Sequence, residues 1–431
     1  MNLASMVDRT LHKQTDANVP TEWTWYRLDE VCTEVVDCPH STPQLRPTGP
    51  LIARSQDIRS GVFRVQEAAR VSEDTYRERA RRAEPRHGDL LYSREGTYFG
   101  IAAEVPRHER VCLGQRMVLL RPDKSLLDHR FLRYWLNSPV LTRFIHGFRD
   151  GTVAERLNLP TIRALPVPLP PLPDQKQIAK ILGALDDKIE LNRRMNETLE
   201  TIARVMFSAW FLVSNASEIA MKELIEIDPA ERLTKNQLVR WVEMKGIPTS
   251  GPSIMGWTQR EFNGGSKFRN GDTLLARITP CLENGKTALV DILKNGEVAA
   301  GSTEFIVMRG RSGVSSAWVY CLARSDAFRE FAIQQMTGSS GRQRVPNGAI
   351  AGYGIPAPRR EDLDRFDTAT RSIFDMISSN RVESQILADL RDTLLPKLLS
   401  GELRVGDAES VTERDESRAA RAVATLMNPE R

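Results

Sequence analysis

The chain has 431 residues, with 60 lysines and arginines against 56 aspartates and glutamates. This length predicts two or three domains, and a hydrophobic content of 41% excludes a wholly disordered chain. No run of about 18 apolar residues is present, which excludes a transmembrane helix, and the polar first twenty residues contain no secretory signal. The five cysteines are scattered and form no CxxC motif, so neither a disulfide framework nor a zinc site is predicted, and we expect a cytoplasmic protein.

Two stretches of the chain carry its positive charge. Residues 46–163 contain 22 basic and 14 acidic residues, and residues 240–344 contain 14 and 9. Residues 174–204 have six of each, and residues 359–404 have 8 basic against 9 acidic residues. A concentrated basic block favours a polyanionic partner, because neutralising phosphates releases condensed counterions. A solvated surface without a ligand is equally compatible with the charge alone.

The first block, from about Trp23, is predicted to be mixed α/β. It contains a strand-like run over 111–120 and a helical pattern over 128–137 that continues beyond Pro139 through Phe144. Its Gly-flanked loops carry Arg, Thr and Gln, and Arg can form two hydrogen bonds to guanine as Gln can to adenine. A solvated loop is the alternative for each. The candidate DNA contacts of this block are Arg94, Thr97, Gln115 and Arg116.

A long helix is predicted from Pro173 to Phe211. Its seam residues recur at alternating steps of three and four, a mean period of 3.5 that is typical of a coiled coil, and two asparagines lie in the middle. An ordinary core helix is the alternative for one such pattern. The residues predicted to pack on a partner helix are Ile178, Leu182, Leu185, Ile189, Asn192, Asn196 and Leu199.

The second block repeats the mixed α/β pattern. A strand is predicted over 304–308 and a helix over 316–336, and Asn284-Gly285 is a plausible hairpin turn. Its densest loop, over 338–344, again offers Arg and Gln between glycines. The candidate DNA contacts of this block are Arg277, Ser302, Arg342, Gln343 and Arg344.

A second long helix follows, and its seam lies 188 residues after the first in the same register. Polar residues again occupy its centre, and Arg391 takes one seam position. Pro396 is predicted to kink or end this helix, with Gly401 as its cap. The residues predicted to pack on the first helix are Ile373, Ile377, Asn380, Ser384 and Leu387.

Block, proline-rich elbow and long helix therefore occur twice. Pro168 and Pro170 match Pro356 and Pro358 at the same offset of 188 residues. We predict a tandem duplication with pseudo-twofold symmetry and a helix pair whose polar layers fix the register. These layers would align in either direction. We favour an antiparallel pair, which places the two blocks at opposite ends.

Catalytic motifs are not found. The sequence Gly285-Lys286-Thr287 resembles the end of a P-loop, but Pro280 stands where that motif needs its first glycine. Of the six histidines, only His40 has a cysteine at ligand spacing, in Cys38-Pro39-His40, and a structural loop is the better interpretation of that trio. The sequence therefore indicates no active site of its own.

Four motifs link this chain to a known protein family: Leu169-Pro170-Pro171-Leu172-Pro173-Asp174-Gln175-Lys176-Gln177-Ile178, Leu185-Asp186-Asp187-Lys188-Ile189-Glu190-Leu191-Asn192, Asp37-Cys38-Pro39-His40-Ser41-Thr42-Pro43 and Leu394-Leu395-Pro396-Lys397-Leu398-Leu399-Ser400-Gly401-Glu402-Leu403. In these motifs the chain resembles the specificity subunits of type I restriction–modification systems. With the duplication, the resemblance covers nearly everything from about Trp23 to Val405. The second elbow of this chain, over 356–363, departs from the family pattern because it lacks the Gln-Lys-Gln run of the first.

This resemblance implies a noncatalytic DNA-specificity subunit with an α/β fold. Two target recognition domains would each read half of a bipartite site on double-stranded DNA. Two long antiparallel helices would set the spacer and dock two methyltransferase (modification) subunits, to which restriction subunits add ATP-driven translocation and cleavage. S-adenosylmethionine, ATP and Mg would belong to those partner subunits, and we expect no cofactor on this chain.

Six segments are predicted along the chain: a flexible N-terminus over 1–20, a recognition domain over 21–170, a spacer helix over 171–214, a second recognition domain over 215–358, a second spacer helix over 359–405 and a charged flexible tail over 406–431. Two other functions are compatible with the same residues. One is a free-standing sequence-specific repressor, and the other is a coiled-coil scaffold whose blocks bind proteins. Enrichment of a bipartite consensus with a fixed gap would favour the specificity subunit.

Overall fold

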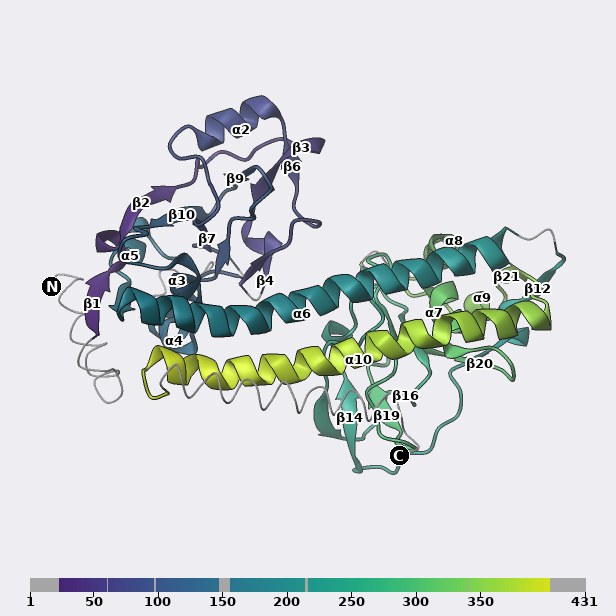
Figure 1. Cartoon of the computed structure of the whole chain (residues 1–431). Coiled ribbons are helices and arrows are strands. Elements are labelled where there is room, and N and C mark those ends of the chain that lie inside the picture. The colour runs from purple at the N-terminus through teal and green to yellow at the C-terminus, as the bar shows by residue number, and fades with distance from the viewer. Residues whose placement is uncertain are drawn as a thin grey trace. The chain divides into compact units, whose positions relative to one another are not determined.

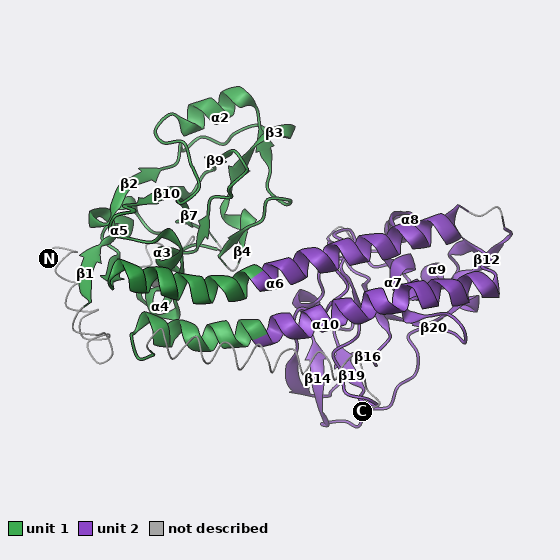
Figure 2. Cartoon of the chain, in the orientation of Figure 1, with its two compact units in different colours: residues 1–187, 387–418 green, residues 188–386, 419–431 purple. Residues whose placement is uncertain are grey.

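The structure is a computed structural model that describes residues 23–59, 61–96, 98–146, 156–213, 216–339 and 341–403 (Figure 1). The segments predicted over 1–20 and 406–431 lie outside these residues. The described chain divides into two compact units (Figure 2). The first holds residues up to Asp187 and from Leu387 onward, and the second holds Lys188–Ile386. No helix among the described residues is both long and apolar enough to cross a bilayer.

The first unit is built on a four-stranded antiparallel sheet in the order β2 (Cys32–Asp37), β10 (Met117–Pro122), β7 (Leu90–Ser93) and β8 (Ala102–Glu104). Every residue of β7 and β10 is buried, as their nearly continuous apolar sequences require. A smaller sheet has the order β6 (Arg70–Val71), β3 (Leu45–Ala53) and β9 (Val111–Leu113), with β3 and β9 parallel. Two further pairs are β1 (Thr24–Arg27) with β11 (Pro166–Leu169) and β4 (Ile58–Arg59) with β5 (Val62–Phe63).

The helices of the first unit are α2 (Glu73–Ala80), α3 (His129–Leu136), α4 (Pro139–His146) and α5 (Leu159–Arg163). The strand predicted over 111–120 is two strands, because the chain turns between β9 and β10 at Arg116, whose φ is +69°. The helix predicted to run through Phe144 is interrupted after Leu136. There the Asn137 side chain bonds both the N–H and the carbonyl of Ala102, at 2.8 Å each.

The second unit contains a four-stranded antiparallel sheet in the order β13 (Ile225–Ile227), β20 (Phe305–Gly310), β17 (Thr273–Ala276) and β18 (Thr287–Leu289). A second sheet has the order β15 (Thr258–Glu261), β14 (Leu238–Val242), β19 (Ala299–Gly301) and β16 (Ser266–Phe268), with β14 and β19 parallel. β12 (Glu218–Ala220) pairs with β21 (Gly354–Pro356). The sheet β2-β10-β7-β8 of the first unit and the sheet β13-β20-β17-β18 of the second connect their strands in the same chain order, with the last strand in sequence lying second in the sheet.

The helices of the second unit are α7 (Ser316–Ala323), α8 (Asp326–Gln334) and α9 (Asn347–Ala351). The single helix predicted over 316–336 is two helices, because Ser325 ends the first and caps the second by accepting the Phe328 N–H. β17 and β18 form the predicted hairpin, although ten residues connect them rather than a tight Asn-Gly turn. Gly285 nevertheless has the positive φ, +71°, that its sequence suggested.

Two long helices contribute to both units: α6 (Leu172–Phe207), which is followed by a π-helical turn over Ser208–Leu212, and α10 (Arg360–Leu399). The second long helix does not stop at Pro396, as one of the two predicted outcomes required, since α10 continues through Pro396 to Leu399. A proline this close to the end removes only one backbone hydrogen bond of the last turn. Gly401 adopts a φ of +71° and donates its N–H to the Leu398 carbonyl, so it caps the helix as expected.

Candidate nucleic-acid interface

In the first unit, three of the four sequence candidates lie together around a small cavity of about 220 Å³. Arg94 follows β7, and Gln115 and Arg116 form the turn between β9 and β10. The turn is held to the loop after β2, because the Gln115 amide donates to the His40 carbonyl at 2.8 Å. The fourth candidate, Thr97, lies outside the described residues.

Both arginines of this first cluster already have carboxylate partners. The Arg94 guanidinium donates to both oxygens of Asp37, at 2.7 and 2.8 Å, and is largely buried. Arg116 Nε lies 3.2 Å from Glu95, and its side chain is 55% exposed. A non-glycine residue rarely adopts the φ of Arg116, and such backbone strain occurs preferentially where a side chain must be presented in one direction. The cluster is polar and near-neutral, with Arg116 as its most accessible cation.

The candidates of the second unit lie around the ends of β17 and β20. Arg277 donates to the Val345 carbonyl at 2.9 Å, and the Gln343 carbonyl accepts the Thr279 N–H at 3.0 Å. Arg344 is bound to both oxygens of Glu304, at 2.6 to 3.1 Å. Hydrogen bonding from Arg344 lowers the pKa of the Glu304 carboxyl. The remaining two candidates are Ser302, whose hydroxyl accepts the Glu304 N–H, and Arg342, which is exposed.

In each unit a buried ion pair anchors the strand that leads to a candidate arginine: β7 leads to Arg94 and β17 leads to Arg277. Arg121 on β10 forms two hydrogen bonds, of 2.9 and 2.8 Å, to Asp89 at the start of β7. Arg309 on β20 forms two, of 2.6 and 2.8 Å, to Asp272 at the start of β17. Asp89 is 2% exposed and Asp272 is 1% exposed. The signal in the sequence was the spacing of 188 between Arg121 and Arg309, which is the offset of the elbow prolines.

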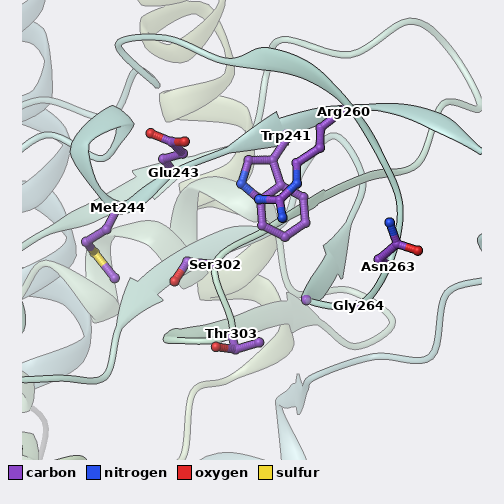
Figure 3. Close-up of a pocket in the computed structure, with 9 residues that line it drawn as sticks. Trp241, Glu243, Met244, Arg260, Asn263, Gly264, Ser302 and Thr303 are labelled. Atoms are coloured by element: carbon purple, nitrogen blue, oxygen red, sulfur yellow. The ribbon is translucent and has the colours of Figure 1, made fainter. Parts of the chain in front are cut away.

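A larger cavity, of about 440 Å³, lies in the second unit beside the exposed edge strand β15 of the sheet β15-β14-β19-β16. It is lined by Trp241 of β14, Arg260 of β15, the loop at Asn263 and the start of the segment after β19 (Figure 3). Of its lining residues only Ser302 was predicted to be a contact. The other lining residues were not predicted. Asn263-Gly264-Gly265, for example, is an ordinary turn signal in the sequence.

The polar seam residues of the long helices meet in the second unit. The Asn192 amide donates to the Ser384 hydroxyl at 3.2 Å and to Glu383 at 2.7 Å, and Asn380 donates to Asn196 at 2.8 Å. Because the partner number falls as the α6 number rises, the two segments are antiparallel here. Within the second unit, Asn380 and Ile377 are buried, and Ile189, Leu199, Ile373 and Ser384 are half-buried.

In the first unit, the predicted seam residues Ile178, Leu182, Leu185 and Leu387 are buried. A charged network joins this end of the long helices to α3 and the sheet. Asp186 of α6 accepts from Arg133 of α3 at 3.1 Å and from Arg391 of α10 at 2.9 Å. Arg133 in turn lies 3.1 Å from Glu104 of β8. Arg391, which looked out of place in an apolar seam, is therefore an ion-pair partner. Among the described residues, no group of His, Cys, Asp and Glu side chains is arranged to hold a metal ion.

Comparisons with known proteins agree with this architecture. Residues 20–201 match the family model described as the type I restriction modification DNA specificity domain. The HindI specificity subunit of Haemophilus influenzae is 21% identical over 73% of this chain and 86% of that relative. The EcoAI specificity subunit of Escherichia coli is 31% identical, but over 36% of this chain and 26% of that relative. The crystal structure of a type I restriction-modification S subunit from M. genitalium shares the fold, with a TM-score of 0.54, 14% identity and coverage of 87% of this chain and 96% of that one.

Proposed function

We propose that this chain is a specificity subunit of a type I restriction–modification system and gives that system its DNA sequence specificity, because residues 20–201 match the specificity-domain model and most of the chain is similar to the HindI specificity subunit. As a subunit of this kind the chain is noncatalytic. One observation carries the proposal most directly: in each unit a candidate arginine, Arg94 or Arg277, lies among further candidate contacts at the end of a strand that a buried Asp–Arg pair anchors. Two recognition surfaces in one chain suit a target with two half-sites.

We propose that the two halves arose by duplication. The equal strand order of the sheets β2-β10-β7-β8 and β13-β20-β17-β18 supports this proposal. The matching pairs Asp89–Arg121 and Asp272–Arg309 support it too. The recognition domains would then extend over 21–170 and 215–358, with the spacer helices over 171–214 and 359–405. Each domain would contact DNA through the candidates named above, and the Arg94 and Arg344 ion pairs would open or be shared when a phosphate or base approaches.

The long helices are proposed to act as a coiled coil that fixes the distance between the half-sites. With 36 residues in α6 and 40 in α10, at ~1.5 Å per residue they measure about 54 and 60 Å. These lengths exceed one turn of DNA, which is about 34 Å. The buried asparagine layer supports a single register, since a slipped helix would bury amides against apolar side chains.

Assembly with the other subunits of the system is part of the same proposal. Two modification subunits would dock on the helices, restriction subunits would add to that complex, and S-adenosylmethionine, ATP and Mg would bind to those partners rather than to this chain. A repressor of the same fold would need no methyltransferase. Copurification of the tagged chain with a methyltransferase therefore separates the two functions.

The direct test is selection from a degenerate duplex library with the full chain in complex with its modification subunits. We expect enrichment of a bipartite consensus with a fixed gap. Sequencing the methylated motifs of the host with and without this chain should then show the loss of that same motif. A selection that enriches no sequence would refute a DNA-specificity function.

A further inference from the structure

The edge strand β15 presents an arginine in an unusual setting. All four residues of β15 are exposed, and the Arg260 guanidinium lies 4.6 Å from the centroid of the Trp241 ring (Figure 3). In the register of the two strands Arg260 is opposite Val239, so Trp241 is its diagonal neighbour on the same face. A guanidinium stacked on an indole loses rotational freedom without losing its donors.

The loop at Gly265 also packs closely against the tryptophan. A Cβ atom at Gly265 would lie 2.7 Å from the Trp241 ring and 2.3 Å from the Gly301 carbonyl oxygen, and the φ of Gly265 is +110°. Only glycine permits this approach. The indole is therefore held by close contact with Gly265, and Arg260 stacks on an indole that has little room to move.

Arg260 also differs from most of the predicted contact arginines in having no carboxylate partner among the described residues. Arg94, Arg116 and Arg344 each lie against a carboxylate. For Arg260, no hydrogen bond or ion pair is made to any residue that the structure describes. Glu243, an acid on the cavity wall, is paired with Lys245 at 2.7 Å, and this pair lowers the pKa of Glu243 with a smaller contribution from the charge of Arg260. The five N–H donors of Arg260 are therefore held in one orientation and make no hydrogen bond to the described residues, so they can bind a ligand.

Among the described residues of the first unit, no arginine stacks on a ring at the matching position. Ala53 of β3 and Val242 of β14 hold the same place, since each carbonyl accepts the N–H of the residue after the parallel partner strand, from Gly114 and Ser302. The residue before Ala53 is the fully buried Ile52, whereas the residue before Val242 is Trp241. Two recognition domains with the same fold must differ in the residues that read different bases. The position of Ile52 in the first unit and Trp241 in the second is such a difference.

From these observations we infer that Arg260 reads a guanine in the half-site of the second domain, through bidentate hydrogen bonds to N7 and O6, with Trp241 as its positioning residue. The inference rests on the proposed function and deepens it. The wall of the cavity beyond Arg260 is polar, with Asn263, Ser302 and Thr303. Such side chains suit the neighbouring base edges and phosphates of the same half-site.

The test compares Arg260→Ala and Arg260→Lys with the unaltered chain in the duplex selection described above. Both variants should lose about 5-fold to 150-fold of the preference for one G·C pair, in one half of the consensus, since bidentate pairing needs the fork and not only the charge. The other half-site and the gap should not change. Trp241→Leu should weaken the same preference partially, since it releases the guanidinium without removing it.

The matched control is Arg110→Ala, which removes an exposed arginine that also lies on a ring, 4.3 Å from Tyr76, but is paired with Glu73. It should leave the second-domain consensus intact. Two results would overturn the inference while the proposed function stands: a bipartite consensus that Arg260→Ala leaves unchanged, or an equal loss on all duplexes that Arg260→Lys restores, which marks a phosphate contact. Thermal unfolding of each variant identifies loss of folding, and Arg260→Lys on the exposed strand provides the folded comparison. If the unaltered chain itself enriches nothing, the proposed function fails first.

Discussion

At the scale of single residues, the buried Asp–Arg pairs decide whether the recognition strands keep their place. Asp89 is 2% exposed and Arg121 is 9% exposed. Asp89→Asn removes the buried carboxylate of the pair and leaves Arg121 with Glu34, 2.8 Å away, as its one acidic partner among the described residues, so we expect a loss of about 1.5–3 kcal/mol of unfolding free energy. Urea denaturation measures this loss. Glu73→Gln is the matched control, since its pair with Arg110 is exposed to solvent and should hardly change stability. Equal effects would mean that the buried pair has no special weight.

Glu104 at the end of β8 makes the first unit sensitive to acid. Burial favours its neutral form, but His129, Arg133 and Arg130 outweigh burial and lower the pKa of Glu104 to about 2. A carboxyl whose pKa is lower in the folded state stabilises the fold at pH values above its unfolded pKa of about 4.3, and that contribution is lost as the pH falls towards 2. Glu104→Gln should therefore cost on the order of 2 kcal/mol at pH 7.

The pH series supplies the check on this ion-pair network. The difference in unfolding free energy between Glu104→Gln and the unaltered chain should shrink steadily between pH 4.5 and 2. The exposed Glu78→Gln variant should follow the unaltered chain throughout. A Glu104→Gln deficit that is constant with pH would indicate a packing effect rather than a charge effect.

At the scale of elements, the asparagine layer between α6 and α10 is predicted to fix register more than to add stability. The Asn192 amide has three acceptors, but its buried carbonyl oxygen has no partner among the described residues. Asn192→Leu loses the donor contacts and also removes the unsatisfied oxygen, so the two effects, each about 1–3 kcal/mol, largely cancel. We expect nearly unchanged stability and a mixture of gap lengths in the selected DNA. Leu191→Asn, on an exposed position of the same turn, should keep one gap.

The elements also show what sequence patterns can and cannot predict. The seam of α6 was visible because burial against one partner repeats every 3.5 residues, and Asn192 and Asn380 were found in this way. The breaks at Asn137 and Arg116 were not, since they depend on contacts with distant strands. The Trp241–Arg260 stack was missed for the same reason: the two residues are 19 positions apart and become neighbours only through the register of β14 and β15.

At the scale of the whole molecule, the proposed ruler function predicts how the DNA target responds to helix length. Duplicating residues 189–195 in α6 together with 381–387 in α10 inserts one heptad in each helix at facing positions and removes no existing side chain. The insertion keeps the seam on one face and adds ~10 Å, which corresponds to about three base pairs. We expect the gap of the bipartite consensus to lengthen by that amount while both half-sites stay the same. Inserting seven residues at the exposed turn at Gly296 instead should leave the gap unchanged. An unchanged gap after the paired helix insertion, with a folded and DNA-bound protein, would refute the ruler, because both half-sites would then be read at a distance that the helices do not set.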